Sequence, residues 1–183
     1  FNDAKDLEKY PRTPEKDFLL LNRAGCDVLY FPDKKDIYGE GEFQLKEYDF
    51  GNADKILEGK SRPGHFKGVA NVVRILLQNV QPHVLFLGQK DFQQVQIIRR
   101  MMEIEMMLSV VGSELRNEHR ETNNGIDVVV CPIIREESGL AMSSRNVRLN
   151  NEDRKNAAGI FAAFSLVNKK ENMDEQKKII LGE

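Results

Sequence analysis

The chain has 183 residues, enough for one substantial hydrophobic core or for one domain with part of another. Hydrophobic residues make up 40% and charged residues 31% of it, proportions that are usual for globular proteins. Its formal net charge of −2 gives no positive field for nucleic acid, and no apolar run approaches the roughly 20 residues that span a bilayer. We therefore expect neither a nucleic-acid partner nor a membrane.

The two cysteines, Cys26 and Cys131, have no partner at metal-ligand spacing. Each borders an apolar run, so we expect both to be small buried hydrophobic residues rather than catalytic thiols or disulfide partners. The first residues do not resemble a secretory signal, and the sequence therefore predicts a cytoplasmic protein.

The first predicted element is a helix over about residues 14–24. Thr13 can cap its start, and Gly25 is suited to its end. The apolar run over 27–31, closed by Pro32, predicts a strand.

Helices and strands alternate in the middle of the chain. We expect a strand near 43–48, a short helix near 53–57, a helix from His65, a strand over 84–87 and a helix from Asp91. The helix from His65 has an apolar stripe at helical spacing, formed by Phe66, Val69, Val73, Leu76, Leu77 and Val80.

Further elements follow a polar stretch over 113–125, which we expect to be a solvated loop. A buried-type strand is predicted over 126–130, and a helix capped by Asn150 or Asn151 follows. Short apolar strands that alternate with helices predict an α/β fold with a Rossmann-like parallel sheet, covered on both faces.

The loop after the strand over 84–87 is a candidate binding site, because ligands of open parallel sheets lie beyond the carboxyl ends of the strands. Gly88 permits close approach of a ligand, Lys90 is a compact cation for phosphate oxygens, and helix amides near Asp91 suit an anion. The alternative is an ordinary tight turn, with a surface lysine and an aspartate that caps the helix.

A second candidate loop combines two hydroxyls, a guanidinium and an amide, in Ser143, Ser144, Arg145 and Asn146. These groups suit a triphosphate whose charge grows as its α-phosphorus is attacked. The alternative is an ordinary polar turn, since the same residue types are common in turns.

Taken together, these motifs resemble the pantothenate synthetase family of nucleotidyltransferases, in the same order along the chain. The matching segments are Tyr10-Pro11-Arg12-Thr13, Arg62-Pro63-Gly64-His65-Phe66-Lys67-Gly68-Val69, Gly88-Gln89-Lys90-Asp91, Pro132-Ile133-Ile134-Arg135-Glu136 and Met142-Ser143-Ser144-Arg145. The resemblance runs from about Lys5 to Ala158. It implies a partial Rossmann-like nucleotide-binding domain of the nucleotidyltransferase type over 1–133 and the start of a smaller C-terminal lid domain over 134–183.

The resemblance implies an ATP-dependent ligase that joins pantoate to β-alanine. In this family pantoate and ATP form pantoyl adenylate and pyrophosphate, with magnesium, and β-alanine then displaces AMP. A homodimer is also implied. The alternatives are another nucleotidyltransferase of similar fold and a non-catalytic nucleotide-binding fragment.

The resemblance also assigns site residues. It implies catalytic roles for Lys90, Ser143, Ser144 and Arg145, and contacts with ATP for Gly88, Gln89, Lys90, Asp91, Ile134, Met142, Ser143, Ser144 and Arg145. Gln94 is expected to bind pantoate, and Asp17 to be associated with magnesium. His65 is expected to have a structural role where the loop enters its helix.

The sequence departs from the family pattern in three respects. The region over 113–125 is longer than usual, which we expect to enlarge a surface loop between a helix and a strand. Gln89 stands where the family usually has an acidic residue, which is a mild change because a backbone contact does not need that side chain. The family also has a His-rich phosphate motif that would precede Phe1. We therefore expect this chain by itself to be inactive or weakly active.

Overall fold

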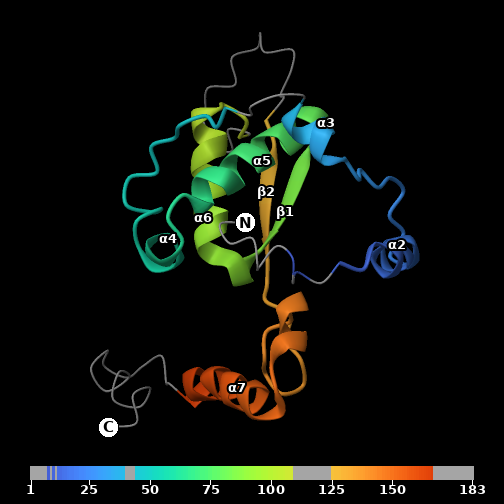
Figure 1. The fold of residues 1–183 in the computed structure, drawn as a ribbon, viewed down its shortest axis with the longest axis vertical. Coiled ribbons are helices and arrows are strands. Elements are labelled where there is room, and N and C mark those ends of the chain that lie inside the picture. The colour runs from blue at the N-terminus through green and yellow to red at the C-terminus, as the bar shows by residue number, and fades with distance from the viewer. Residues whose placement is uncertain (1–7, 9, 11, 40–43, 109–124, 167–183) are drawn as a thin grey trace, which may run out of the picture. The chain divides into compact units, whose positions relative to one another are not determined.

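A computed structural model describes residues 8, 10, 12–39, 44–108 and 125–166 (Figure 1). Contacts divide the chain into two compact units, Phe1–Cys131 and Pro132–Glu183. Unit 1 contains, in chain order, α2 (Pro14–Arg23), α3 (Lys34–Tyr38), α4 (Leu57–Ser61), α5 (His65–Val80), β1 (Val84–Gly88), η1 (Gln89–Asp91), α6 (Phe92–Ile104) and β2 (Asp127–Cys131). Unit 2 contains the 3-10 turn η2 (Ser144–Arg148) and the helix α7 (Asn151–Leu166).

The two strands of unit 1 pair in parallel. Their register runs from Val84 opposite Asp127 to Gly88 opposite Cys131. The chain passes through α6 between them, as parallel strands require a crossover connection. This confirms the α/β class and the parallel pairing, and it places the loop after Gly88 at the carboxyl end of the strand pair.

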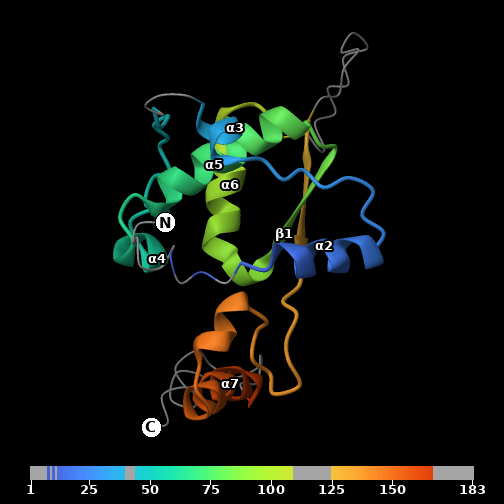
Figure 2. The ribbon, with the colours of Figure 1, turned by 45° about the vertical axis from the view of Figure 1, so that its right-hand side comes forward.

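The core of unit 1 lies between α5, α6 and one face of the strands. Both helices are on the same side of the strand pair (Figures 1 and 2). Leu85, Leu87 and Val128 of that face pack against the core, whose buried members are Phe50, Phe66, Ala70, Leu77, Ile97, Ile98, Met101, Met102 and Ile126. The helical spacing of apolar residues therefore predicted α5 and α6 correctly, except that Val80 at the end of α5 and Phe92 at the start of α6 are exposed.

The opposite face of the strands is only partly covered by the described residues, and no described helix packs on it. Val84, Phe86 and Val129 point to this face, and Phe86 is 65% exposed. The prediction of a sheet covered on both sides is therefore wrong for the part of the chain that the structure describes. The sequence signal is genuine, since both faces are apolar, but helices lie against only one of them.

The predicted strand over 27–31 forms no ladder with any described segment. Val28 is 82% exposed and Phe31 is 75% exposed. A strand requires a backbone partner, and strand-type residues alone do not supply one. The preceding helix α2 begins and ends close to its predicted bounds, but none of its side chains is buried.

The segment expected to form a strand near 43–48 is held by side chains instead, in its described part. Asn71, fully buried in α5, accepts a hydrogen bond from Lys46 N at 2.8 Å and donates one to Lys46 O at 2.9 Å. Glu105 accepts hydrogen bonds from Lys46 Nζ at 2.6 Å and from Tyr48 Oη at 2.8 Å. Burial, and then the neighbouring Glu105, raise the pKa of Tyr48 above its ordinary value of 10.0.

Three smaller expectations have mixed outcomes. The short helix expected over 53–57 begins only at Leu57, and Asn150 caps α7 by accepting a hydrogen bond from Asp153 N at 2.8 Å. Except for Gly125, the predicted loop over 113–125 lies outside the described residues.

Both cysteines are less buried than predicted. Cys26 is exposed just beyond the end of α2, and its thiol donates to Val28 O at 3.2 Å, while Cys131 is half-buried at the end of β2. The prediction of two buried residues is wrong because the apolar runs beside them are themselves exposed or half-exposed.

Within the described ranges, every helix is too short or too polar to cross a lipid bilayer.

Gly59 provides a test of the packing of α4. A Cβ atom added there would lie 2.2 Å from the backbone oxygen of Asp54, which cannot move without its segment. We expect Gly59→Ala to lower the free energy of unfolding by about 1–3 kcal/mol, the usual cost of overpacking. The matched control is Gly68→Ala in α5, where the added Cβ meets nothing within 4 Å in the part of the chain that the structure describes. It should be neutral or stabilising by about 0.5–1 kcal/mol. Urea unfolding measures both, and equal losses would contradict the packing argument.

Candidate functional site

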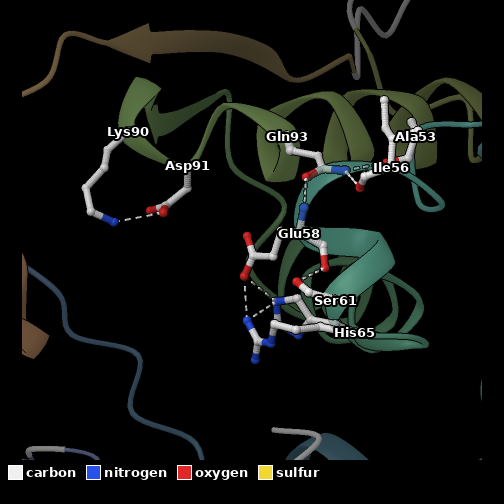
Figure 3. A network of polar contacts seen from close by, with 9 residues as sticks. Ala53, Ile56, Glu58, Ser61, His65, Lys90, Asp91 and Gln93 are labelled. Atoms are coloured by element: carbon white, nitrogen blue, oxygen red, sulfur yellow. Dashed lines mark hydrogen bonds and ion pairs between the residues drawn. The ribbon is translucent and has the colours of Figure 1, made fainter. Parts of the chain in front are cut away.

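The loop after β1 presents an exposed charged pair at the carboxyl end of the strands. Lys90 Nζ donates to Asp91 Oδ1 at 2.9 Å, and both side chains are exposed (Figure 3). An exposed pair of this kind contributes little to stability, so Lys90 can turn toward an incoming anion at low cost. The Asp91 side chain makes no capping hydrogen bond to α6. The alternative of a simple helix-capping aspartate is therefore wrong.

Gly88 has an ordinary backbone conformation, with φ −78° and ψ 127°. A Cβ atom added there would meet no atom of the described residues within 4 Å. The fold of unit 1 therefore does not itself require glycine at this position. The sequence suggests instead that glycine lets a ligand approach the backbone closely, and this geometry is compatible with that role.

Gln94, the predicted pantoate-binding residue, is half-exposed in the first turn of α6. Its neighbour Gln93 was not predicted to have a role. Gln93 Nε2 donates to Ala53 O at 2.7 Å and to Ile56 O at 2.8 Å, and its Oε1 accepts from Glu58 N at 3.1 Å (Figure 3). No sequence signal distinguishes the two glutamines, because the partners of Gln93 lie far away in the chain.

His65 begins α5 and belongs to a polar cluster with α4. Arg62 Nη1 donates to Glu58 Oε1 at 2.6 Å and lies 3.0 Å from His65 Nε2. An arginine N–H can only donate, so His65 Nε2 is the acceptor in this contact. This geometry agrees with the structural role predicted for His65.

In unit 2, Asn146 closes the loop that contains Ser143, Ser144 and Arg145. Its Nδ2 donates to Ala141 O and to Glu136 Oε1, both at 3.0 Å. Inside the loop, Ser143 Oγ accepts from Arg145 N at 3.3 Å. The loop is therefore tied at both ends while the side chains of Ser144 and Arg145 are exposed.

Glu136, which binds Asn146 of this loop, is itself held by Arg154. It accepts two hydrogen bonds from Arg154 Nη2, at 2.8 Å to Oε1 and 2.7 Å to Oε2. The hydrogen bond from Asn146, and then the bonds and charge of Arg154, hold the pKa of Glu136 below its ordinary value of 4.5, against an opposing effect of burial.

Two further predicted ATP contacts are neighbours within unit 2. Met142 N donates to Ile134 O at 2.9 Å, and both side chains are exposed. An exposed apolar pair of this kind suits the flat face of a nucleobase. Their pairing was not foreseen from the sequence.

Asp17, the predicted magnesium residue, is exposed on α2, where its Oδ1 accepts from Thr13 Oγ1 at 3.2 Å. No group of three or more potential metal ligands occurs among the described residues. A nearby hollow of about 520 Å³ is lined by Pro14, Glu15, Phe18, Leu19, Leu29 and Phe31. Its walls are mostly apolar and do not suit a triphosphate.

Comparison with known proteins decides the family. Residues 1–181 match the family model described as pantoate-beta-alanine ligase. The chain belongs to the pantoate–β-alanine ligase family. It is 44% identical over 160 residues to the pantothenate synthetase of Porphyromonas gingivalis, covering 87% of this chain and 50% of that relative. It is 42% identical over 175 residues to that of Cytophaga hutchinsonii, covering 96% of this chain and 55% of that relative.

Solved structures of the pantoate–β-alanine ligase family share the fold. The pantothenate synthetase of Thermus thermophilus matches with a TM-score of 0.83 and 34% identity, over 100% of this chain and 61% of that one. The ligase of Francisella tularensis, solved with β-γ ATP and β-alanine, matches with a TM-score of 0.76 and 34% identity, over 100% of this chain and 62% of that one. This chain thus spans about half the length of the curated relatives it matches.

Glu136 gives unit 2 a defined pH dependence. Because its pKa is lowered in the folded chain, the stability that it contributes is present above pH 4.5 and is lost as the pH falls through its folded pKa. We expect the amides of residues 142–146 to lose protection from hydrogen exchange over this acid range. A carbon NMR titration should show the midpoint of Glu136 rising in Asn146→Ala. Lys155→Met, an exposed change on α7, should leave that midpoint nearly unchanged. An unmoved midpoint in Asn146→Ala would contradict the assignment.

Proposed function

We propose that the protein carrying this chain joins pantoate to β-alanine at the expense of ATP. The observation that carries the proposal is the family match along residues 1–181. The exposed Lys90 at the carboxyl end of parallel strands supports it, since this is where such folds bind their ligands. The relative from Francisella tularensis was solved with an ATP analogue and β-alanine, which is compatible with the same substrates here.

The reaction proceeds in two steps, neither of which needs a protein nucleophile. A carboxylate oxygen of pantoate attacks the α-phosphorus of ATP, and the bond from that phosphorus to the bridging oxygen breaks, releasing pyrophosphate. The amine of β-alanine then attacks the acyl carbon of pantoyl adenylate. An amide forms, AMP leaves, and the amine loses a proton. Catalysis in both steps consists of positioning and charge stabilisation.

The proposal gives a role to each of the residues that the family resemblance assigns. Lys90 neutralises growing charge on the phosphates, the hydroxyls of Ser143 and Ser144 donate to phosphate oxygens, and the planar guanidinium of Arg145 donates two parallel bonds. The amide of Gln94 donates to and accepts from the hydroxy acid pantoate. The remaining contacts with ATP come from Gly88, Gln89, Asp91, Ile134 and Met142.

ATP enters in this proposal as its magnesium complex. Magnesium is commonly held by substrate phosphates and water with only one or two carboxylates, so a cluster of protein ligands is not needed. Contact between Asp17 and this magnesium ion remains a prediction, and we assign no step of the reaction to the metal. A cytoplasmic homodimer is part of the same proposal.

Product formation tests the function directly. We expect the full-length protein to release pyrophosphate when ATP and pantoate are present, and to release AMP with repeated turnover only when β-alanine is present as well. Pyrophosphate release with a different acid would instead indicate another nucleotidyltransferase. ATP binding in a calorimeter without any turnover would indicate a nucleotide-binding protein that is not a ligase, and either result would overturn the proposal.

Lys90 tests the proposed phosphate loop. We expect Lys90→Met to lower kcat/KM for ATP by about 100- to 1,000-fold, the usual effect of removing one group that stabilises transition-state charge. Lys55→Met is the matched control, since Lys55 is also an exposed lysine of unit 1 but lies outside the loop. It should retain wild-type kinetics. Similar losses in both variants would show a general effect of charge and not a role of the loop.

A further inference from the structure

The Gln93 side chain uses all of its hydrogen-bonding atoms on the backbone of one distant segment. Nε2 donates to Ala53 O and Ile56 O, at 2.7 and 2.8 Å, and Oε1 accepts from Glu58 N at 3.1 Å. Figure 3 shows the amide pointing from the first turn of α6 into the turn that precedes α4. We call this set of contacts the Gln93 clamp.

The clamp encloses a strained residue. Leu57 lies between Ile56 O and Glu58 N, two of the atoms that Gln93 binds, and it has a φ of +48°. Residues with a Cβ rarely adopt this left-handed conformation unless surrounding contacts impose it. The Leu57 side chain is 74% exposed, so its own packing is a weak constraint. Gln93 binds this turn on both sides of Leu57, and a backbone hydrogen bond from Lys60 N to Ile56 O at 3.3 Å adds to its contacts.

The clamp also connects two groups of polar residues. On one side, Gln93 follows the Lys90–Asp91 pair and immediately precedes Gln94. On the other side, the Glu58 carboxylate accepts from Arg62 at 2.6 Å and lies 3.9 Å from His65 Nε2. The first turn of α6 is thereby joined to the first turn of α5 through α4.

We propose that Gln93 is a positioning residue for the ligase reaction. It fixes the first turn of α6, and with it Gln94 and Asp91, against the turn that precedes α4. The inference rests on the proposed function, because its kinetic consequence requires that Gln94 binds pantoate. A displacement of about 1 Å at a substrate-positioning group can lower the rate by about 100-fold.

The main test compares Gln93→Met with Gln96→Met in the full-length protein. Both replace a glutamine of α6, and Gln96 is exposed. We expect Gln93→Met to lower kcat/KM for pantoate by about 10- to 100-fold at temperatures well below its Tm. The amides of residues 57–61 should also lose protection from hydrogen exchange. Gln96→Met should change neither quantity, and wild-type pantoate kinetics in Gln93→Met would overturn the proposal.

A rescue experiment separates positioning from a general loss of stability. Glycine adopts positive φ without strain, so Leu57→Gly reduces the need for the clamp. We expect the double variant Gln93→Met with Leu57→Gly to regain part of the lost kcat/KM for pantoate. Lost activity without any such recovery would contradict the role assigned to the strained turn.

A second variant covers the case in which Gln93→Met does not fold. Gln93→Glu keeps the length and the acceptor but places a negative oxygen against two carbonyl groups. Its activity relative to the wild type should rise as the pH falls, because a protonated carboxyl can donate one hydrogen bond. A constant ratio across the pH range would overturn the proposal.

Failure of the proposed function can be distinguished from failure of the Gln93 clamp. If the wild-type protein forms no AMP, the ligase proposal fails and the positioning role fails with it, while hydrogen exchange still reports whether the clamp exists. If the wild type is active and the exchange of residues 57–61 is the same in Gln93→Met, only the clamp fails.

Discussion

The parallel pairing of β1 with β2 determines where unit 1 can bind a ligand. Because both strands run in the same direction, Gly88 and Cys131 end at one edge, opposite each other in the register. The loop that carries Lys90 begins at this edge, and the chain passes into unit 2 directly after Cys131. Packing of α5 and α6 on one face of the strands keeps this edge in place.

Hydrophobic periodicity was sufficient to predict the main elements. The stripe of α5, the strand β1 and the position of the Lys90 loop follow from spacing and from the glycine that ends the strand. Periodicity failed where a segment depends on a partner elsewhere in the chain. The run over 27–31 is strand-like in composition but forms no ladder with the described residues, and Cys26 beside it is exposed.

Neutral amide side chains organise both loops that we assign to ATP. Gln93 binds three backbone groups beside the Lys90 loop, and Asn146 ties Ala141 to Glu136 beside the Ser143 loop. An amide side chain donates and accepts hydrogen bonds but carries no charge. It can therefore hold a backbone segment without neutralising the nearby cationic side chains, which stay available to an anionic ligand. The sequence could not reveal this function of Gln93, because its partners are distant and it has the same chemistry as any surface glutamine.

Asn71 extends the same chemistry into the core. By accepting from Lys46 N and donating to Lys46 O, its side chain imitates the backbone of a neighbouring strand. Both contacts are made to main-chain atoms, which every residue type has, except that proline lacks the backbone N–H that donates to Asn71. The segment around Lys46 can therefore vary in sequence while keeping its position. Asn71 itself has little freedom to vary, because aspartate lacks the donor and leucine lacks both groups.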